Sequence, residues 1–273
     1  DANVAAMMGY LMERSENLQP GTLVYRMDGY DIDKVDRRAL QEIYTESLAA
    51  GDIRITDHCV SSGSVPFWHE LVSGGGNCNH VPGVDGASSA GRTHAEIEGR
   101  RAIMRALRML RRVPGCENLR ISEVASECGI RESRRIVGEQ RVSVAAYTSG
   151  HVWSDAICYS FYPIDVHHHE SNTIDTRPLE RGVVPTIPYG ALIPRGSDAL
   201  LVAGRCISGD SEASSAFRVQ ATCMATGQAA GAAAAVSARE QISARQVDVA
   251  ALRALLEEQG AIVPSVERGV VSS

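Results

Sequence analysis

The chain has 273 residues, of which 44% are hydrophobic and 22% charged, and it carries a net charge of −6. This is the composition of an ordinary globular protein, and the length allows one large domain or two smaller ones. The acidic balance excludes the broad basic surface that nucleic acids or anionic membranes attract, and no uncharged stretch is apolar enough to span a bilayer. The seven cysteines never form a CxxC pair, so we expect reduced thiols in a cytoplasmic protein.

Hydrophobic periodicity predicts strands and helices along the whole chain. Strands are expected at residues 21–27, 53–56, 64–72, 142–146 and 199–203. The flanking Pro114–Gly115 and Gly129 set off residues 118–128 as a further strand. Helices are expected at residues 35–50, 92–112, 217–238 and 247–259. The Gly- and Ser-rich residues 73–89 must form a loop, and the four prolines of residues 178–194 indicate a stiff, extended crossing. These elements together predict an α/β protein.

The second predicted helix is rich in arginine. We expect its core-facing side to carry Ile97, Ile103, Leu107 and Leu110. The arginines between residues 100 and 112 then lie on the outer face. A solvated helix face explains them better than a phosphate-binding surface does.

The connection between the predicted strand 199–203 and the predicted helix 217–238 is unusually long. Such loops usually take about two to six residues, whereas this one has 13, mostly Gly, Ser and charged. We therefore expect the connection to bind a ligand. Ser214 or Ser215 can cap the helix, and uncapped N–H groups at its start would form a positive site for a phosphate, a carboxylate or a ring oxygen. A packed helix without a ligand is the alternative.

Residues 167–169 are three consecutive histidines, of which His167 and His169 would share one face of a strand. A metal site would need further ligands, and the sequence offers no second spaced pair, so no metal is predicted. A general base is better supported, because histidine is the commonest residue for that task near neutral pH. Histidines that are simply hydrogen-bonded in the wall of a site are the other alternative.

The segment Gly129–Arg135 concentrates three arginines and Glu132 within seven residues. A surface cluster of salt bridges is one interpretation, because arginine side chains are mostly exposed. The other is that one or two of the guanidinium groups fork onto a carboxylate or phosphate oxygen of a ligand.

Two segments, Leu200–Ser208 and Arg218–Gly231, resemble the C-terminal flavin-binding signature of the FAD-dependent oxidoreductase family. Residues 95–101, 129–139 and 187–194 are similar to other segments of that family. The resemblance implies a Rossmann-like FAD/NAD(P)-binding α/β domain with an inserted mixed-sheet α+β substrate domain. The implied boundaries place residues 1–23 and 186–273 in the flavin-binding domain and residues 24–185 in the inserted domain.

The resemblance also implies FAD as the cofactor and hydride transfer between a small organic substrate and the flavin as the reaction. His167 matches the family's Tyr-Pro-Ile-Asp-x-His segment, so that His167 or Tyr189 would move a proton. Arg134 or Arg177 would hold an anionic or hydroxylated substrate. The residues expected to contact the cofactor are Asp1, Asn3, Gly204, Arg205, Ser208, Ser215, Arg218, Val219 and Gln220.

The sequence departs from the family pattern in one respect. The family carries a G-x-G-x-x-G fingerprint after an N-terminal strand, and no such motif follows a predicted strand here. We therefore expect a second polypeptide, or a further N-terminal segment, to supply a strand–GxGxxG–helix unit that pairs beside residues 199–203. A homo-oligomer is also compatible with the sequence, whereas nucleic-acid and membrane partners are not expected. The alternative function is a non-catalytic interaction subunit that retains the flavoprotein fold without binding flavin by itself.

Overall fold

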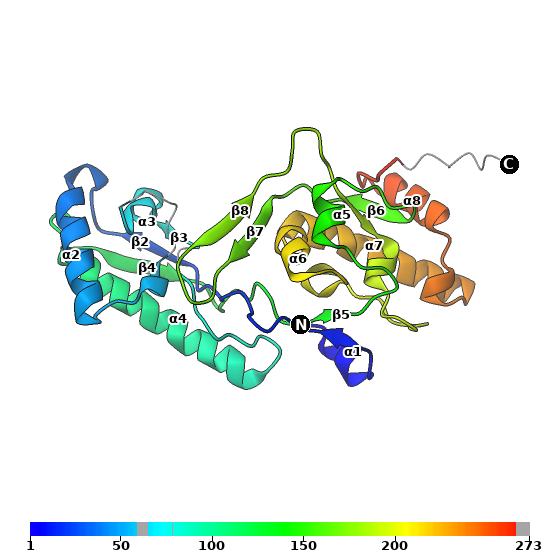
Figure 1. Ribbon diagram of the computed structural model, residues 1–273, viewed down its shortest axis with the longest axis horizontal. Helices are drawn as coiled ribbons and strands as arrows, with labels where there is room; N and C mark the ends of the chain where they lie inside the picture. Colours follow the sequence, from blue (N-terminus) through cyan, green and yellow to red (C-terminus); the bar gives the residue numbers. More distant parts are fainter. Residues whose placement is uncertain (59–64, 78, 266–273) are drawn as a thin grey trace. The chain divides into compact units, whose positions relative to one another are not determined.

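The structure is a computed structural model that describes residues 1–58, 65–77 and 79–265. The chain forms two compact units, which Figure 1 traces along the sequence. Unit 1 contains Asp1–Ser15, Arg134–Asp165 and Thr176–Ser273, and unit 2 contains Glu16–Ser133 and Val166–Asp175. The segment expected as an inserted domain, residues 24–185, therefore includes most of unit 2 together with residues 134–165 and 176–185 of unit 1.

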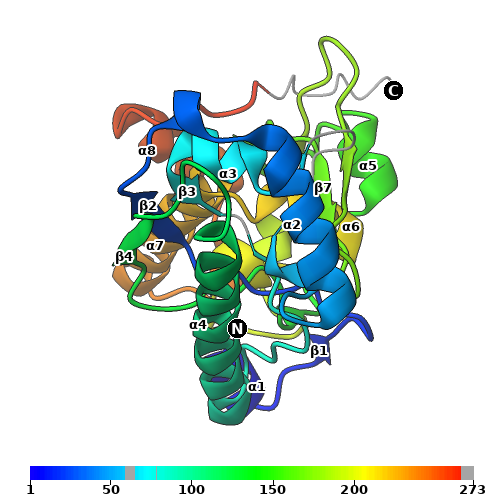
Figure 2. The ribbon, with the colours of Figure 1, turned by 90° about the vertical axis from the view of Figure 1, so that its left-hand side faces the viewer.

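Unit 2 is built on a three-stranded antiparallel sheet. Its central strand β2 (Tyr25–Asp28) pairs with β3 (Gly75–Gly76) on one side and with β4 (Arg120–Val124) on the other. The helices of this unit are α2 (Arg37–Ala50), α3 (Trp68–Ser73) and α4 (Ser89–Leu110), with short 3-10 turns at Ile32–Lys34 and Ile55–Asp57. Helices α2 and α4 pack against each other, as Figure 2 shows.

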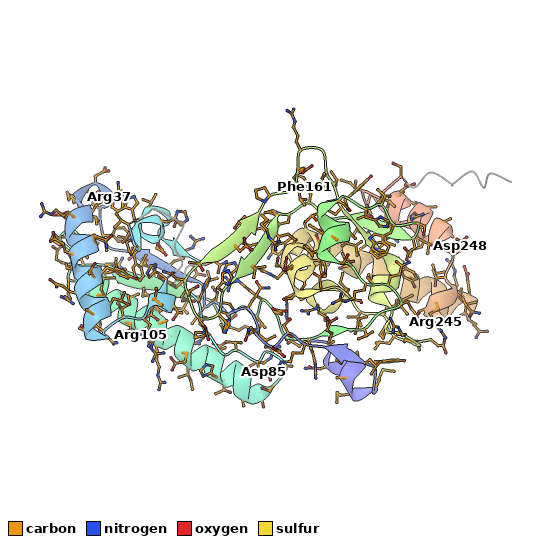
Figure 3. All side chains as sticks on the ribbon, in the orientation of Figure 1. Arg37, Asp85, Arg105, Phe161, Arg245 and Asp248 are labelled. Carbon is orange, nitrogen blue, oxygen red and sulfur yellow. The ribbon has the colours of Figure 1, made fainter. Side chains whose placement is uncertain are left out.

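The core of unit 2 lies between β2 and these helices. Its fully buried members include Leu23, Tyr25, Leu40, Leu71, Leu110 and Leu119. Gly99 of α4 permits the close contact with the segment that leads into β2, because a Cβ atom at this position would lie 2.9 Å from the Cβ of Leu23. Arg105, labelled in Figure 3, ties α4 to the turn at Ile55–Asp57 through a buried pair of 2.7 Å bonds to Asp57.

Capping residues fix the ends of the long helices. The side chain of Asp36 accepts the N–H groups of Arg38 and Ala39 at the start of α2, and Gly51 ends that helix at a φ of 77°. Ser88 caps α4 in the same way. The sequence predictions of helices at 35–50 and 92–112 are therefore confirmed to within about three residues at each end.

Unit 1 contains two-stranded sheets and a long helix that is rich in alanine and glycine. Strand β1 (Met12–Glu13) pairs with β5 (Arg135–Ile136), and β6 (Ala156–Tyr159) pairs with β9 (Thr186–Pro188), both antiparallel. The helices are α1 (Asn3–Met7), α5 (Val144–Thr148), α6 (Ser211–Phe217), α7 (Gln220–Glu240) and α8 (Val249–Glu258). Short 3-10 turns lie at Tyr189–Leu192, Gly204–Cys206 and Ala244–Gln246.

Helix α7 packs against α8 and β6. Its buried side carries Thr222, Thr226, Ala229, Ala233 and Val236, which recur at helical spacing. Asp248, labelled in Figure 3, caps the start of α8 by accepting the N–H of Ala250. The predicted helix at 247–259 is thereby confirmed, and Leu252 and Leu256 are buried in it.

Strands β7 (Ile164–His167) and β8 (Ile174–Arg177) pair with each other. The distal part of this hairpin, Val166–Asp175, belongs to unit 2, and its base belongs to unit 1. His167 is the last residue of β7.

The predicted strand at 199–203 is wrong as a sheet element. Among the described residues it has no ladder partner and makes one backbone bond, from the N–H of Val202 to the carbonyl of Leu192 at 2.8 Å. The apolar side chains of the segment serve packing and not strand pairing. Leu200 and Val202 join a small core with Ala5 and Ile136.

Two strand predictions in unit 2 are also wrong. Residues 53–56 lead into the 3-10 turn at Ile55–Asp57, and most of the stretch 65–72 belongs to α3, while Ser64 lies outside the described residues. Phe67 and Leu71, four residues apart, are both buried, so the short apolar pattern was that of a helix face.

The remaining corrections concern unit 1 and α4. The predicted strand at 142–146 instead begins α5, which Ser143 caps through the N–H of Ala146. The predicted helix at 217–238 is confirmed as α7 from Gln220 onwards, whereas Phe217 ends the separate helix α6. On α4, Ile97 is 45% exposed, since the inner face follows Ala95, Gly99 and Ile103.

Candidate functional site

The connection that follows residues 199–203 is folded, and half of its length forms helix α6. It starts with the 3-10 turn Gly204–Cys206, where Gly204 has a φ of 72°. This backbone conformation favours glycine, because a side chain there is strained. The N–H of Gly204 donates to Oγ1 of Thr226 at 3.1 Å, which fixes the turn against α7. Part of the excess length that indicated a ligand is therefore explained by α6.

The start of α7 is open. Val219 is its N-cap residue, no side chain caps it, and Gln220 is exposed. The predicted caps are wrong, because Ser214 and Ser215 lie buried within α6. Ser215 accepts the N–H of Asp165 at 2.9 Å and donates to the carbonyl of Glu212. The first N–H groups of α7 have no intrahelical acceptor, and the helix dipole makes this end positive.

Four of the predicted site residues meet at the first residues of the chain. The buried carboxylate of Asp1 accepts from both terminal nitrogens of Arg205 at 3.2 Å. Arg134 donates from Nε to the carbonyl of Asp1 at 2.8 Å and from Nη2 to Oδ1 of Asn3 at 2.7 Å. Charge-assisted bonds of this kind hold the segment firmly against the loop.

A cavity of about 370 Å³ adjoins this cluster. Its lining comprises Asp1–Ala5, Leu200–Ala203 and Cys206. Its lining combines the apolar side chains of residues 200–203 with the polar atoms of Asp1 and Asn3. Such a lining suits a ligand with an apolar body and a few polar groups.

The other predicted residues of unit 1 make contacts within the protein. Arg218 donates from Nη2 to the side chain of Asp165 at 3.1 Å and to its carbonyl at 3.2 Å. Ser208 is buried, and its backbone bonds to Ala191 and Val142. Arg177 forms an ion pair with Glu212 in which both side chains are about half exposed.

Tyr189 lies at the start of the 3-10 turn that follows β9. Its hydroxyl donates to the carbonyl of Ala244 at 2.8 Å, and burial raises its pKa to about 12. A hydroxyl in this state gives up its proton with difficulty at neutral pH. The prediction that Tyr189 and His167 face one cavity stays a prediction.

His167 lies in unit 2 and is 6% exposed. Its Nδ1 is 2.7 Å from Nε2 of His80, and its backbone N–H donates to Oε1 of Gln19 at 3.2 Å. Burial, together with the nearby Arg131, His167 and His58, lowers the pKa of His80 to about 4. Sequence reasoning missed His80 and Gln19, because they lie 87 and 148 residues from His167 and no local pattern joins them.

The arginines of Gly129–Arg135 are mostly buried, so the interpretation as a surface salt-bridge cluster is wrong for Arg131 and Arg135. Arg131 donates to the carbonyl of Pro20, to Oγ1 of Thr22 and to Oδ1 of Asn77. Arg135 donates to the carbonyl of Gly209 at 2.9 Å. Arg131 thus adds a positive charge to the polar interior of unit 2 near His80.

Two further properties of the described residues bear on function. Within residues 1–58, 65–77 and 79–265, no three His, Cys, Asp or Glu side chains gather in a way that could hold a metal ion. Over the same ranges, none of the helices combines the length and the apolar character that crossing a membrane requires.

Comparison with known proteins gives one finding. The family model described as FAD dependent oxidoreductase matches residues 1–256. No curated protein and no solved structure matches the chain. The matched range includes the loop at Gly204, the open start of α7 and the hairpin that carries His167. The family suggests a Rossmann-like α/β fold, and the described residues form helices with small two- and three-stranded sheets. Because the match spans nearly the full length, the chain belongs to the FAD dependent oxidoreductase family, and its cofactor is FAD.

Proposed function

We propose that the protein transfers a hydride between a small organic substrate and FAD, with the flavin ring held along Gly204–Cys206 and the start of α7. The observation that carries the proposal is the exposed, uncapped start of α7, together with the left-handed Gly204, which contacts the first two turns of that helix at Cys223 and Thr226. Bound FAD supplies the redox chemistry, and the chain binds and orients it.

Three features of unit 1 fit this cofactor. Gly204 has no side chain to keep a flat ring away from the backbone. The N–H groups of Gln220 and the following residue suit the electron-rich edge of such a ring, because they have no intrahelical acceptor and the helix dipole adds positive potential. The cavity beside Asp1 and Asn3 leaves about 370 Å³ for a further part of the cofactor.

The proton of the reaction is assigned to His167. It is the family-matched histidine, and it lies in a buried polar cluster in which a second imidazole holds its ring. Tyr189 is the weaker candidate, because its proton is already donated to Ala244. Arg177 is the candidate for holding an anionic substrate, since a carboxylate can replace Glu212 in a half-exposed ion pair. Arg134 would act by holding Asp1 and Asn3.

Substitution of Gly204 tests the ring site. In Gly204→Val a branched side chain would occupy a backbone with a φ of 72° and approach Cys223, so we expect the purified protein to lose its flavin absorbance. Gly182→Val is the matched control, because Gly182 has a φ of 89° and open space around it. Stoichiometric flavin in Gly204→Val would contradict the site. A wild-type protein without flavin bands would instead favour the non-catalytic interaction subunit.

We further propose that a strand–GxGxxG–helix unit, on a second polypeptide or a further segment, covers one face of unit 1. Two observations support it. Residues 199–203 have no ladder partner among the described residues, and Gly227 and Gly231 lie exposed on α7 with no atom within 4 Å of an added Cβ. Small residues on one helix face allow a neighbouring backbone to approach closely.

We place the protein in the cytoplasm. The cysteines whose state the structure describes, at 116, 128, 158, 206 and 223, are free thiols, as expected in a reducing compartment. Fractionation of the source cells, followed by immunodetection, would test this assignment, and recovery in a secreted or periplasmic fraction would contradict it.

A further inference from the structure

Two histidines and one backbone carbonyl form a chain of hydrogen bonds inside unit 2. Nδ1 of His167 lies 2.7 Å from Nε2 of His80, and Nδ1 of His80 lies 3.0 Å from the carbonyl oxygen of Ser171. The two rings meet edge to face, with centroids 4.9 Å apart. Both histidines are buried, at 1% and 6% exposure for His80 and His167.

The carbonyl oxygen of Ser171, at one end of this chain of hydrogen bonds, determines which ring nitrogens carry a proton. A carbonyl oxygen can only accept, so the proton of neutral His80 must lie on Nδ1. Nε2 of His80 then carries a lone pair and can only accept from Nδ1 of His167. His80 stays neutral near pH 7, because burial lowers its pKa to about 4 and the groups that face it, Arg131, His167 and His58, oppose a second positive charge.

We propose that His80 is a positioning residue that holds His167 in the tautomer protonated on Nδ1, so that Nε2 of His167 is the atom that exchanges the proton. The inference rests on the proposed function for the role of that proton, and on the hydrogen-bond geometry together with the neutrality of His80 for the tautomer. His167 donates from Nδ1 both as neutral imidazole and as imidazolium, so His80 need not ionise in either state. The bond also favours the imidazolium, because a hydrogen bond to a charged donor is stronger than one to a neutral donor.

The arrangement also orients the ring. Ser171 and His167 belong to the same β7–β8 hairpin, so His80 is bonded to the hairpin at two points. The hairpin end is closed by a bond from the N–H of His168 to the carbonyl of Thr173, and the backbone N–H of His167 is held by Gln19. A third bond, from Asn172 to Nε2 of His58, anchors the same hairpin end to a second buried histidine. Orientation by a neighbouring group is how enzymes keep a histidine base in its productive geometry.

The test is the tautomer of His167, read directly from two-bond ¹H–¹⁵N correlation spectra of the full chain labelled with ¹⁵N-histidine. His167→Ala assigns the signals by their loss. In the wild type at pH 7.5 we expect the proton of His167 on Nδ1 and the lone pair on Nε2. A neutral His167 protonated on Nε2 would overturn the proposal, whatever the activity.

Three variants distinguish the positioning of His167 by His80 from a nonspecific disturbance of the fold. His80→Leu removes the acceptor, so the Nδ1-protonated signal of His167 should be lost in favour of a mixture of tautomers. His80→Gln keeps an acceptor oxygen and should restore that signal. His94→Gln, a substitution of an exposed histidine, should leave it unchanged. An unchanged His167 tautomer in a folded His80→Leu protein would also overturn the proposal. Full turnover in His167→Ala would refute the proposed proton transfer and leave the tautomer assignment standing.

Discussion

Glu70 is a buried carboxylic acid at 2% exposure on helix α3. Burial raises its pKa from 4.5 to about 7, so folding favours the protonated form. A raised pKa of this kind contributes stability below pH 4.5, and that stability is lost as the pH rises through 7. The ionised carboxylate costs roughly 3 kcal/mol of unfolding free energy at pH 8.5.

Glu70→Gln should therefore be more stable than the wild type at pH 8.5, and its advantage should shrink towards pH 5. Urea unfolding at the two pH values measures the difference. Glu98→Gln is the control, because the bond from Arg101 and the charges of Arg101, Arg54 and Arg105 lower the pKa of Glu98. If the gain in unfolding free energy of Glu70→Gln were the same at both pH values, ionisation of Glu70 would not destabilise the folded protein.

His167 should dominate the chemical step if it moves the proton. General acid or base catalysis contributes about 10²–10⁴-fold, so His167→Ala should lower turnover by that factor with flavin content unchanged. His168→Ala is the adjacent control, since the sequence match assigns no role to that residue. A His167→Ala protein with full turnover would leave the histidine as a structural member of the hairpin.

At the scale of elements, two glycines on two helices should respond oppositely to the same substitution. Gly99 of α4 faces Leu23, and an added Cβ would lie 2.9 Å from the Cβ of that residue, which cannot move without its backbone. Gly227 of α7 is exposed with open space around it. Overpacking costs about 1–3 kcal/mol, whereas alanine is favoured over glycine in a helix by about 1 kcal/mol.

Gly99→Ala should therefore lower the melting temperature of the isolated chain, and Gly227→Ala should raise it slightly. Thermal unfolding followed by circular dichroism distinguishes the two. Equal effects of the two substitutions would mean that the contact between α4 and the β2 segment relaxes without cost.

The long helices were predictable and the short elements were not. Helices α2, α4 and α8 carry several turns of apolar periodicity, which identifies a helix without help from tertiary contacts, and each buries leucines on one face: Leu40, Leu110 and Leu252. The windows at 53–56, 65–72 and 142–146 are too short for a period of 2 to be separated from one of 3.6, and tertiary contacts decided them. The break between α6 and α7 escaped prediction because Ser214 and Ser215 read as caps, whereas Asp210 caps α6 through the N–H of Ala213.

At the scale of the whole molecule, the parts of the proposed site that are local in sequence were the ones that the sequence could suggest. Gly204 begins the connection, and Val219 and Gln220 begin the helix that follows it. Because these residues are close in sequence, the sequence alone suggests that they lie close together. His80 reaches His167 across 87 residues, and only the folded unit 2 brings them together. The buried bonds of Arg131 depend on the same long-range packing, which no spacing rule encodes.

The exposed face of α7 gives the last prediction. Because an added side chain at Gly231 meets no atom within 4 Å, Gly231→Leu should leave the melting temperature of the isolated chain unchanged or slightly raised. The same side chain would block the close approach of a covering strand–GxGxxG–helix unit, so FAD retention in the assembled protein should fall. Native mass spectrometry measures both the assembly and its flavin. A wild-type species of 29.2 kDa that is monomeric and binds FAD tightly by itself, with Gly231→Leu behaving alike, would show that this face needs no partner.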